Sequence, residues 1–243
     1  MIKLKDVSIF EERRLVVKDF NLEIKKGETV AIIGPHLSHK SKILRAIVDP
    51  LIEFNGEITV NHYKKTSESL LARRQLGYLP NPPVVEPHLT GYEFMEMVGS
   101  FYHLPPKQRP KIIQELAQSL SCESDLYLPL GQVDPLVLQK IAILTSLIHH
   151  PQILIWDEPI ANLDFSSQNS VLDILKRHMK EGGCALIATN NLGFAQKIAD
   201  RFVFMTNGLM ITEGTLAQLK NLTKTDSLDL EKIYLKIADE LRP

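Results

Sequence analysis

The segment ILIWDEPIANLD, residues 153–164, decides the fold class of this chain. Its first four residues are apolar, as expected of a strand that is buried on both faces of a sheet. The strand delivers Asp157 and Glu158 at its carboxyl end. This pair suits phosphate chemistry with Mg²⁺, because the first carboxylate reaches the metal through water and the second orients or deprotonates an attacking water. A solvated strand end followed by a helix cap is the alternative interpretation, and the pair alone leaves both open.

The same alternation of strand and helix extends in both directions from this segment. Residues 29–33 predict another buried strand, which leads through a short loop into a helical pattern from Ser41 to Val48. Helices with capping signals at Thr90 and Asp134 interrupt the alternation. The pattern predicts one α/β domain over residues 1–243. Residues 1–87 and 149–225 form its mostly parallel core, which includes an N-terminal antiparallel β subdomain. A helical subdomain spans 88–148, and a C-terminal helix spans 226–243.

Charge and composition exclude several classes of protein. The 28 Lys and Arg are balanced by 29 Asp and Glu, so the formal net charge is −1 and no nucleic-acid partner is expected. No apolar run reaches the ~20 residues that span a bilayer, and the first residues lack the apolar core of a signal peptide. The two cysteines, Cys122 and Cys184, lie far apart, which favours a reduced, cytosolic protein.

The run DEP followed by ANLD resembles the Walker B motif and D-loop of the ABC ATPases, and similar motifs cover nearly the whole chain. Residues 34–41 lie where that family has its Walker A loop, 76–81 at the Q-loop, 133–140 at the signature motif and 189–191 at the H-loop. The stretches LTGYEFMEMVGSFYHLP and LEKIYLKIADEL look most like subunits of ABC-2 type exporters. The resemblance implies a P-loop NTPase core with ATP and Mg²⁺ as cofactors.

The resemblance also implies roles for individual residues. ATP is expected to contact Gly34, His36, His39, Lys40, Ser41 and Lys42, with Phe10 stacked on the adenine. Ser41 and, through water, Asp157 are expected to hold Mg²⁺, and Glu158 is the candidate general base. The alternative for Lys40 and Ser41 is that they merely open a helix. Members of the family dimerise and dock onto a membrane-spanning subunit. We therefore expect a homodimer, or a heterodimer with another ABC ATPase, at the cytoplasmic face of the cell membrane.

The Walker A loop departs from the family pattern at two places. Leu37 and His39 stand where ABC ATPases usually have glycine. If both places need left-handed backbone, each side chain costs ~1–2 kcal/mol. Lys40 and Ser41 remain, so a cation for phosphate and a hydroxyl for Mg²⁺ are kept.

The other motifs depart further. Asp134, Pro135 and Leu136 occupy the places of the Ser-Gly-Gly that faces the opposite subunit's nucleotide, and Asp134 is expected to be a helix cap instead of a ligand. Asn81 replaces the Q-loop glutamine and Asn190 the H-loop histidine, so reach and positive charge are lost. Two functions remain open. One is a pseudo-ATPase that completes or regulates a transporter assembly; the other is a subunit that still hydrolyses ATP to power an ABC-2 type exporter.

Overall fold

A six-stranded sheet forms the centre of the molecule. The computed structural model describes residues 1–225 and 227–240. The strand order is β10-β9-β3-β8-β7-β6, and every neighbouring pair is parallel except β9 and β10. The bounds are β3 (Thr29–Ile33), β6 (Leu76–Leu79), β7 (Ile153–Asp157), β8 (Cys184–Ala188), β9 (Arg201–Thr206) and β10 (Leu209–Gly214). All residues of β3, β7 and β8 are buried, in keeping with sequences that are apolar except for Thr29 and Asp157 at strand ends.

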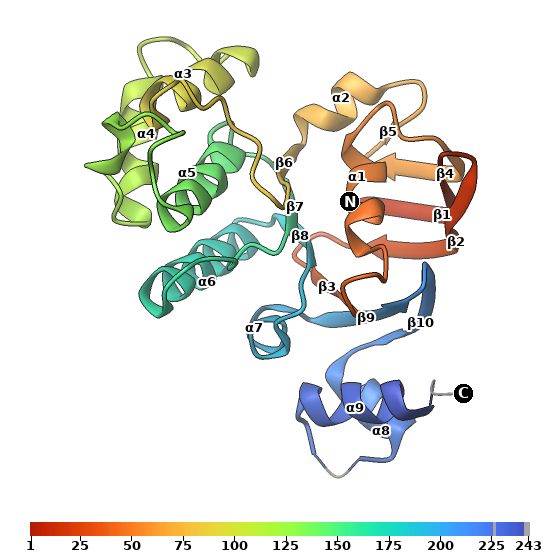
Figure 1. The fold of residues 1–243 in the computed structure, drawn as a ribbon. Coiled ribbons are helices and arrows are strands. Elements are labelled where there is room, and N and C mark those ends of the chain that lie inside the picture. Colours follow the sequence, from red (N-terminus) through yellow and green to blue (C-terminus); the bar gives the residue numbers. More distant parts are fainter. Residues whose placement is uncertain (226, 241–243) are drawn as a thin grey trace.

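A second, antiparallel sheet lies beside the first (Figure 1). Its strand order is β2-β1-β4-β5. The bounds are β1 (Ile2–Glu11), β2 (Arg14–Ile24), β4 (Phe54–Val60) and β5 (Tyr63–Lys64). The predicted N-terminal antiparallel subdomain is thus present, and it also includes β4 and β5, which the sequence pattern did not assign to strands.

Three longer helices and one 3₁₀ turn lie on the opposite side of the main sheet from the antiparallel sheet (Figure 1). They are α3 (Gly91–Phe101), α4 (Arg109–Ser119), η1 (Asp125–Tyr127) and α5 (Pro135–Leu147). Thr90 and Glu93 form the expected capping box, and Asp134 caps α5 with proline at the first helical position. Buried side chains of α5 pack with Leu154 and Trp156 of β7 in one apolar cluster, so the helical layer is held against the strand that carries the carboxylates.

The remaining helices cover the core and the C-terminal end. They are α1 (Lys40–Val48), α2 (Ser69–Arg74), α6 (Phe165–Lys180), α7 (Leu192–Ile198), α8 (Leu216–Thr223) and α9 (Leu230–Glu240). The expected helix 226–243 corresponds in its described part to α9, while residues 226 and 241–243 lie outside the described residues. Helix α8 was not predicted. Side chains of α9 pack with Ile33 and Phe204 beneath the main sheet.

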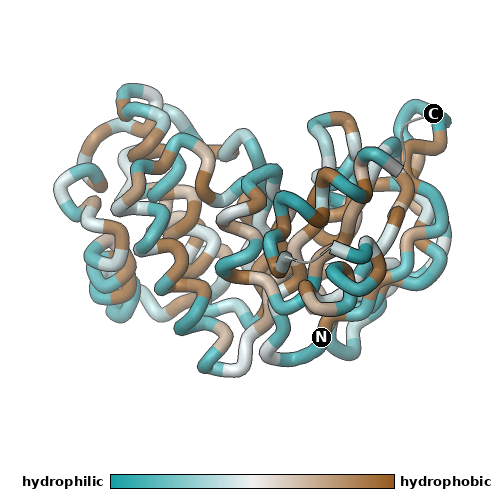
Figure 2. Tube along the Cα trace, turned by 90° about the horizontal axis from the view of Figure 1, so that it is seen from below, coloured by the Kyte–Doolittle hydropathy of each residue, from teal (hydrophilic) through white to brown (hydrophobic). Residues whose placement is uncertain are grey.

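Hydrophilic residues predominate along the outer turns of the chain trace, and hydrophobic stretches run through its interior (Figure 2). The architecture is the predicted α/β fold, with a mostly parallel core, an antiparallel N-terminal sheet and added helices. Within the described part of the chain, no helix is both long enough and apolar enough to cross a membrane.

Candidate functional site

Three loops meet at the carboxyl ends of adjacent parallel strands. The loop 34–39 follows β3, the Asp157–Glu158 pair ends β7, and residues 189–191 follow β8, which lies between the other two strands. Parallel strands place their carboxyl ends at one edge, so the sheet order itself brings these three segments together.

The loop after β3 has one position with left-handed backbone that is not glycine. His39 has φ 67° and ψ 22°. Leu37 has no positive φ, and its side chain is 77% exposed. The condition of left-handed backbone, on which the cost of each side chain depends, is therefore met at His39 and is not met at Leu37. Gly34 is required by close approach, since a Cβ there would lie 2.1 Å from the carbonyl oxygen of Met205.

Helix α1 begins directly after His39, and no side chain caps it. The backbone N–H of Lys42 donates to the His39 carbonyl oxygen at 3.0 Å, so the N–H groups of Lys40 and Ser41 are the ones that an anion could use at this helix N-terminus. The His36 side chain is exposed in the same loop. Lys42 points elsewhere, because its ammonium forms an ion pair with Glu11, the last residue of β1. That pair also brings the end of β1, with the partly buried Phe10, to the start of α1.

The Lys40 side chain folds back over its own loop. Its Nζ lies 2.7 Å from the carbonyl oxygen of Gly34, 3.2 Å from that of Pro35 and 3.4 Å from the Ser38 hydroxyl. A fourth acceptor, Oδ1 of Asn190, lies 2.8 Å away. Lys40 is only 5% exposed, and burial lowers its pKa although the negative charges of Glu158 and Asp157 oppose that shift.

Asp157 is 3% exposed, and burial raises the pKa of its carboxyl group. A hydrogen bond from the Ser41 hydroxyl and the charge of Lys40 act in the opposite direction. Ser41 and Asp157 thus lie together, as Mg²⁺ ligation requires. Across the described residues, no three His, Cys, Asp or Glu side chains cluster as a metal site. A cation here would take its other ligands from phosphate and water.

Glu158 has left-handed backbone, with φ 46°, and its side chain accepts a hydrogen bond of 2.9 Å from the Thr189 hydroxyl. Burial raises the pKa of its carboxyl group, which Thr189, Lys40 and the backbone N–H of Asn190 partly offset. A raised carboxyl pKa increases basicity, which suits a general base.

Two supporting residues were missed by the sequence analysis. The Thr189 hydroxyl holds Glu158, and Gln139 of α5 donates to the carbonyl oxygens of Pro159 (3.0 Å) and Glu158 (3.4 Å). Gln139 is 1% exposed and its Oε1 has no partner in the described structure. The signal for Gln139 was a polar residue within a mostly apolar helix, and for Thr189 a hydroxyl directly after a buried strand.

The signature position is used within the chain. Oδ1 of Asp134 accepts a hydrogen bond of 2.9 Å from the backbone N–H of Val137, as the capping prediction requires. Pro135 has no backbone N–H to offer, and the Leu136 side chain stands at the start of the helix. The N-terminus of α5 is therefore occupied by this chain's own carboxylate.

Asn81 lies just beyond β6, next to the strand that carries the carboxylates. Its side chain is exposed and makes no hydrogen bond in the described part of the chain. It is thus near the site without being fixed in it.

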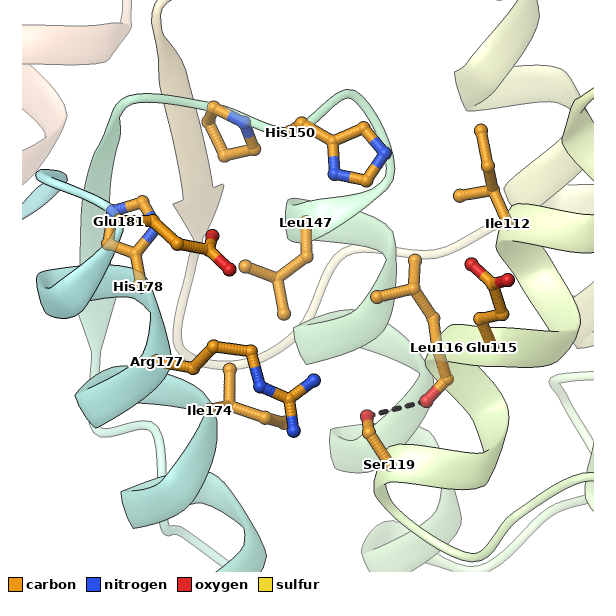
Figure 3. Close-up of a pocket in the computed structure, with 11 residues that line it drawn as sticks. Ile112, Glu115, Leu116, Ser119, Leu147, His150, Ile174, Arg177, His178 and Glu181 are labelled. Carbon is orange, nitrogen blue, oxygen red and sulfur yellow. Dashed lines mark hydrogen bonds between the residues drawn. The ribbon is translucent and has the colours of Figure 1, made fainter.

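A separate cavity of about 260 Å³ lies between α4, the end of α5 and α6 (Figure 3). Leu116, Leu147 and Ile174 form its apolar floor, and Arg177 and Glu181 border it. It lies at the amino end of β7, because His150 and Pro151 also line it. None of the candidate phosphate or carboxylate residues lines this cavity, so it is distinct from the site described above.

Comparison with known proteins gives consistent matches. A profile of the family described as "ABC transporter" matches residues 17–161, more than half of the chain. The glutamine transport ATP-binding protein GlnQ of Bacillus subtilis is 33% identical over 217 residues, covering 84% of this chain and 86% of the relative. The ABC-type transporter ATP-binding protein EcsA of the same organism is 25% identical over 240 residues, covering 99% and 97%.

Solved structures agree. An ATP-binding subunit of an ABC transporter superposes with a TM-score of 0.92 at 26% identity, covering 98% of this chain and 99% of the other. The cassette MJ0796, as a dimer in a post-hydrolysis state bound to ADP and Pi, superposes with a TM-score of 0.81 at 25% identity, covering 88% and 98%.

Proposed function

The chain belongs to the ABC transporter family, as one of its ATP-binding subunits, and we propose that it is a degenerate member. Its role is then that of a pseudo-ATPase, which completes or regulates a transporter assembly with little or no hydrolysis of its own. The alternative is a subunit that still hydrolyses ATP to power an ABC-2 type exporter.

One observation carries the proposal: Asp134 caps the helix that should face the opposite subunit's nucleotide. Its carboxylate accepts from Val137 N–H at 2.9 Å, and Pro135 removes a further donor. Two unit charges at ~4 Å repel by ~1–4 kcal/mol at effective dielectrics of 80 to 20. A phosphate brought to this helix therefore meets a negative charge where donors are needed, and the site completed by this chain's signature is a poor one.

The chain's own loop fits ATP and Mg²⁺ better than its signature does. Gly34 lets the loop pack against Met205, the start of α1 offers N–H groups, Lys40 supplies a cation, and Ser41 with Asp157 suits the metal. When bound, Mg-ATP supplies the phosphoanhydride bond, and the metal balances its charge. Lys40, Ser41 and Asp157 would hold this ligand and Glu158 would orient a water. The intact Glu158 is the observation that favours the alternative.

The partners follow from the family. We propose that the chain pairs with a second copy or with another ABC ATPase, and that it sits at the cytoplasmic face of the membrane on a membrane-spanning subunit. A cleft of about 250 Å³ beside residues 80–85 suits that docking. It is lined by Tyr78, Val84, Phe94, Val98 and Tyr102, among others. An amphipathic segment of the partner would bury its apolar side there.

The test is steady-state phosphate release by the purified full chain with Mg-ATP. We expect release at background level in both the wild type and Glu158→Gln. The matched variant Asp134→Ser/Pro135→Gly/Leu136→Gly restores the family signature, and a gain of hydrolysis that Glu158→Gln then removes would support degeneracy. Robust release by the wild type that is abolished by Glu158→Gln would contradict the proposal and favour the alternative.

A further inference from the structure

Lys40 is fixed by two kinds of acceptor. Three belong to its own loop, within six residues of it: the Gly34 and Pro35 carbonyl oxygens and the Ser38 hydroxyl. The fourth, Oδ1 of Asn190, comes from the end of β8, 150 residues further along the chain, at 2.8 Å. Among the hydrogen bonds of Lys40 within the described residues, this one joins the lysine to the end of another strand, while Glu158 and Asp157 act on it through charge. With four acceptors near three N–H donors, the ammonium has no donor left over.

Asn190 is itself held in place. The neighbouring Thr189 hydroxyl donates to Glu158 at 2.9 Å, and the backbone N–H of Asn190 also bonds Glu158. On the other side, Asn191 caps α7 by accepting from the N–H of Phe194 at 2.8 Å. The Asn190 amide is therefore presented by a backbone fixed at both neighbours, so it can hold Lys40 without ordering a free loop.

A phosphate group needs the same ammonium. The lysine of such a loop binds phosphate as a point charge through its N–H donors. While Lys40 bonds Gly34 and Asn190, those donors are turned into the protein, and the side chain is only 5% exposed. The family histidine at this position would not present an amide oxygen to the lysine, whereas asparagine does.

We propose that Asn190 competes internally with nucleotide phosphate for Lys40. Its amide acts as an autoinhibitory latch, which keeps the Lys40 ammonium bonded within the protein until the amide–ammonium hydrogen bond is broken. The inference rests on the proposed function only in taking residues 34–41 as the phosphate loop. It adds a reason for weak binding that lies outside that loop. The apparent affinity for nucleotide is then the intrinsic affinity multiplied by the fraction of molecules in which the latch is open.

The first test is calorimetric binding of Mg-ATP to the full chain and two variants. Asn190→Leu has a similar size but no acceptor, and it should bind about tenfold more tightly. Asn190→Asp keeps the acceptor and adds a charge that strengthens the pair with Lys40, so it should bind more weakly than the wild type. Unchanged or weaker binding by Asn190→Leu, with an unchanged melting temperature, would overturn the latch and make Asn190 a phosphate ligand or a bystander.

The second test needs no nucleotide. Acylation of Lys40 by dilute acetic anhydride, followed by peptide mass spectrometry, reports how often the side chain leaves its acceptors. Lys111, whose side chain is 82% exposed, is the internal reference. The acylation rate of Lys40 relative to that of Lys111 should rise several-fold in Asn190→Leu and fall in Asn190→Asp. The same relative rate in the wild type and in both variants would refute the latch. This measurement tests the latch even if no variant binds ATP. Neither test depends on hydrolysis, whereas the proposed function is tested by hydrolysis, so the two can fail separately.

Discussion

Replacing His39 by glycine should stabilise the protein, because this residue holds left-handed backbone at φ 67°. A side chain in that region costs ~1–2 kcal/mol. Glycine removes this cost but loses more backbone entropy on folding, which opposes the gain by roughly 0.5–1 kcal/mol. The net expectation for His39→Gly is a free energy of unfolding higher by about 0.5–1 kcal/mol.

Leu37→Gly is the matched control in the same loop. Leu37 has no positive φ and is 77% exposed, so glycine relieves no strain and loses little burial. It should lower the free energy of unfolding by roughly 0.5–1 kcal/mol. The two variants then differ by about 1–2 kcal/mol, which separates their urea midpoints by roughly 0.5 M at a typical slope. If His39→Gly is no more stable than Leu37→Gly, the assignment of backbone strain to His39 is wrong.

Two further predictions concern a cap and a buried imidazole. Asp134→Ala should lower the free energy of unfolding by ~1 kcal/mol because Val137 N–H loses its acceptor, whereas Asp134→Ser should be nearly neutral since serine also caps helices. Thermal or urea unfolding of both variants checks this. Equal losses of stability in the two variants would show that capping is not the cause. Burial lowers the pKa of His149 from 6.5 to about 4. As pH falls, the imidazole is therefore protonated in the unfolded chain before it is protonated in the folded one. The folded state loses stability between pH 6.5 and 4, by at most about 3 kcal/mol. The variant His149→Phe should lose that part of the pH dependence and keep the stacking on Tyr102, whose ring centroid lies 3.5 Å from that of the imidazole. The free energy of unfolding of both proteins is measured by urea titration at several pH values. If it changes with pH in the variant as steeply as in the wild type, His149 is not the cause.

The fold could be predicted from sequence because its signals are local. The apolar runs at 29–33, 153–156 and 184–188 are long enough to mark strands buried on both faces. The caps at Thr90 and Asp134 follow from side chains that bond N–H groups three residues away. Strands β4 and β5 were missed because a half-exposed strand such as β4 carries only two buried residues. Its pairing with β1 supplies the rest.

The sequence also named most of the candidate site, since the motifs lie at the ends of those strands. The domain bounds and the roles assigned to Glu158, Lys40, Ser41 and Asp157 remain predictions. The motifs did not reveal which residues their side chains bond to or pair with. Lys42 is paired with Glu11, and Glu158 is held by Thr189.

The amino-acid sequence by itself determined the buried strands of the core, the family, and which motif residues are replaced. Tertiary structure alone decided what each replacement does. His39 is left-handed and Leu37 is not, and Gly34 of the same loop lies against Met205 of a strand late in the chain. Asn190 meets Lys40 only because β3 and β8 are neighbours in the sheet. Local patterns report forces between residues a few positions apart, whereas these contacts exist only after distant strands have paired.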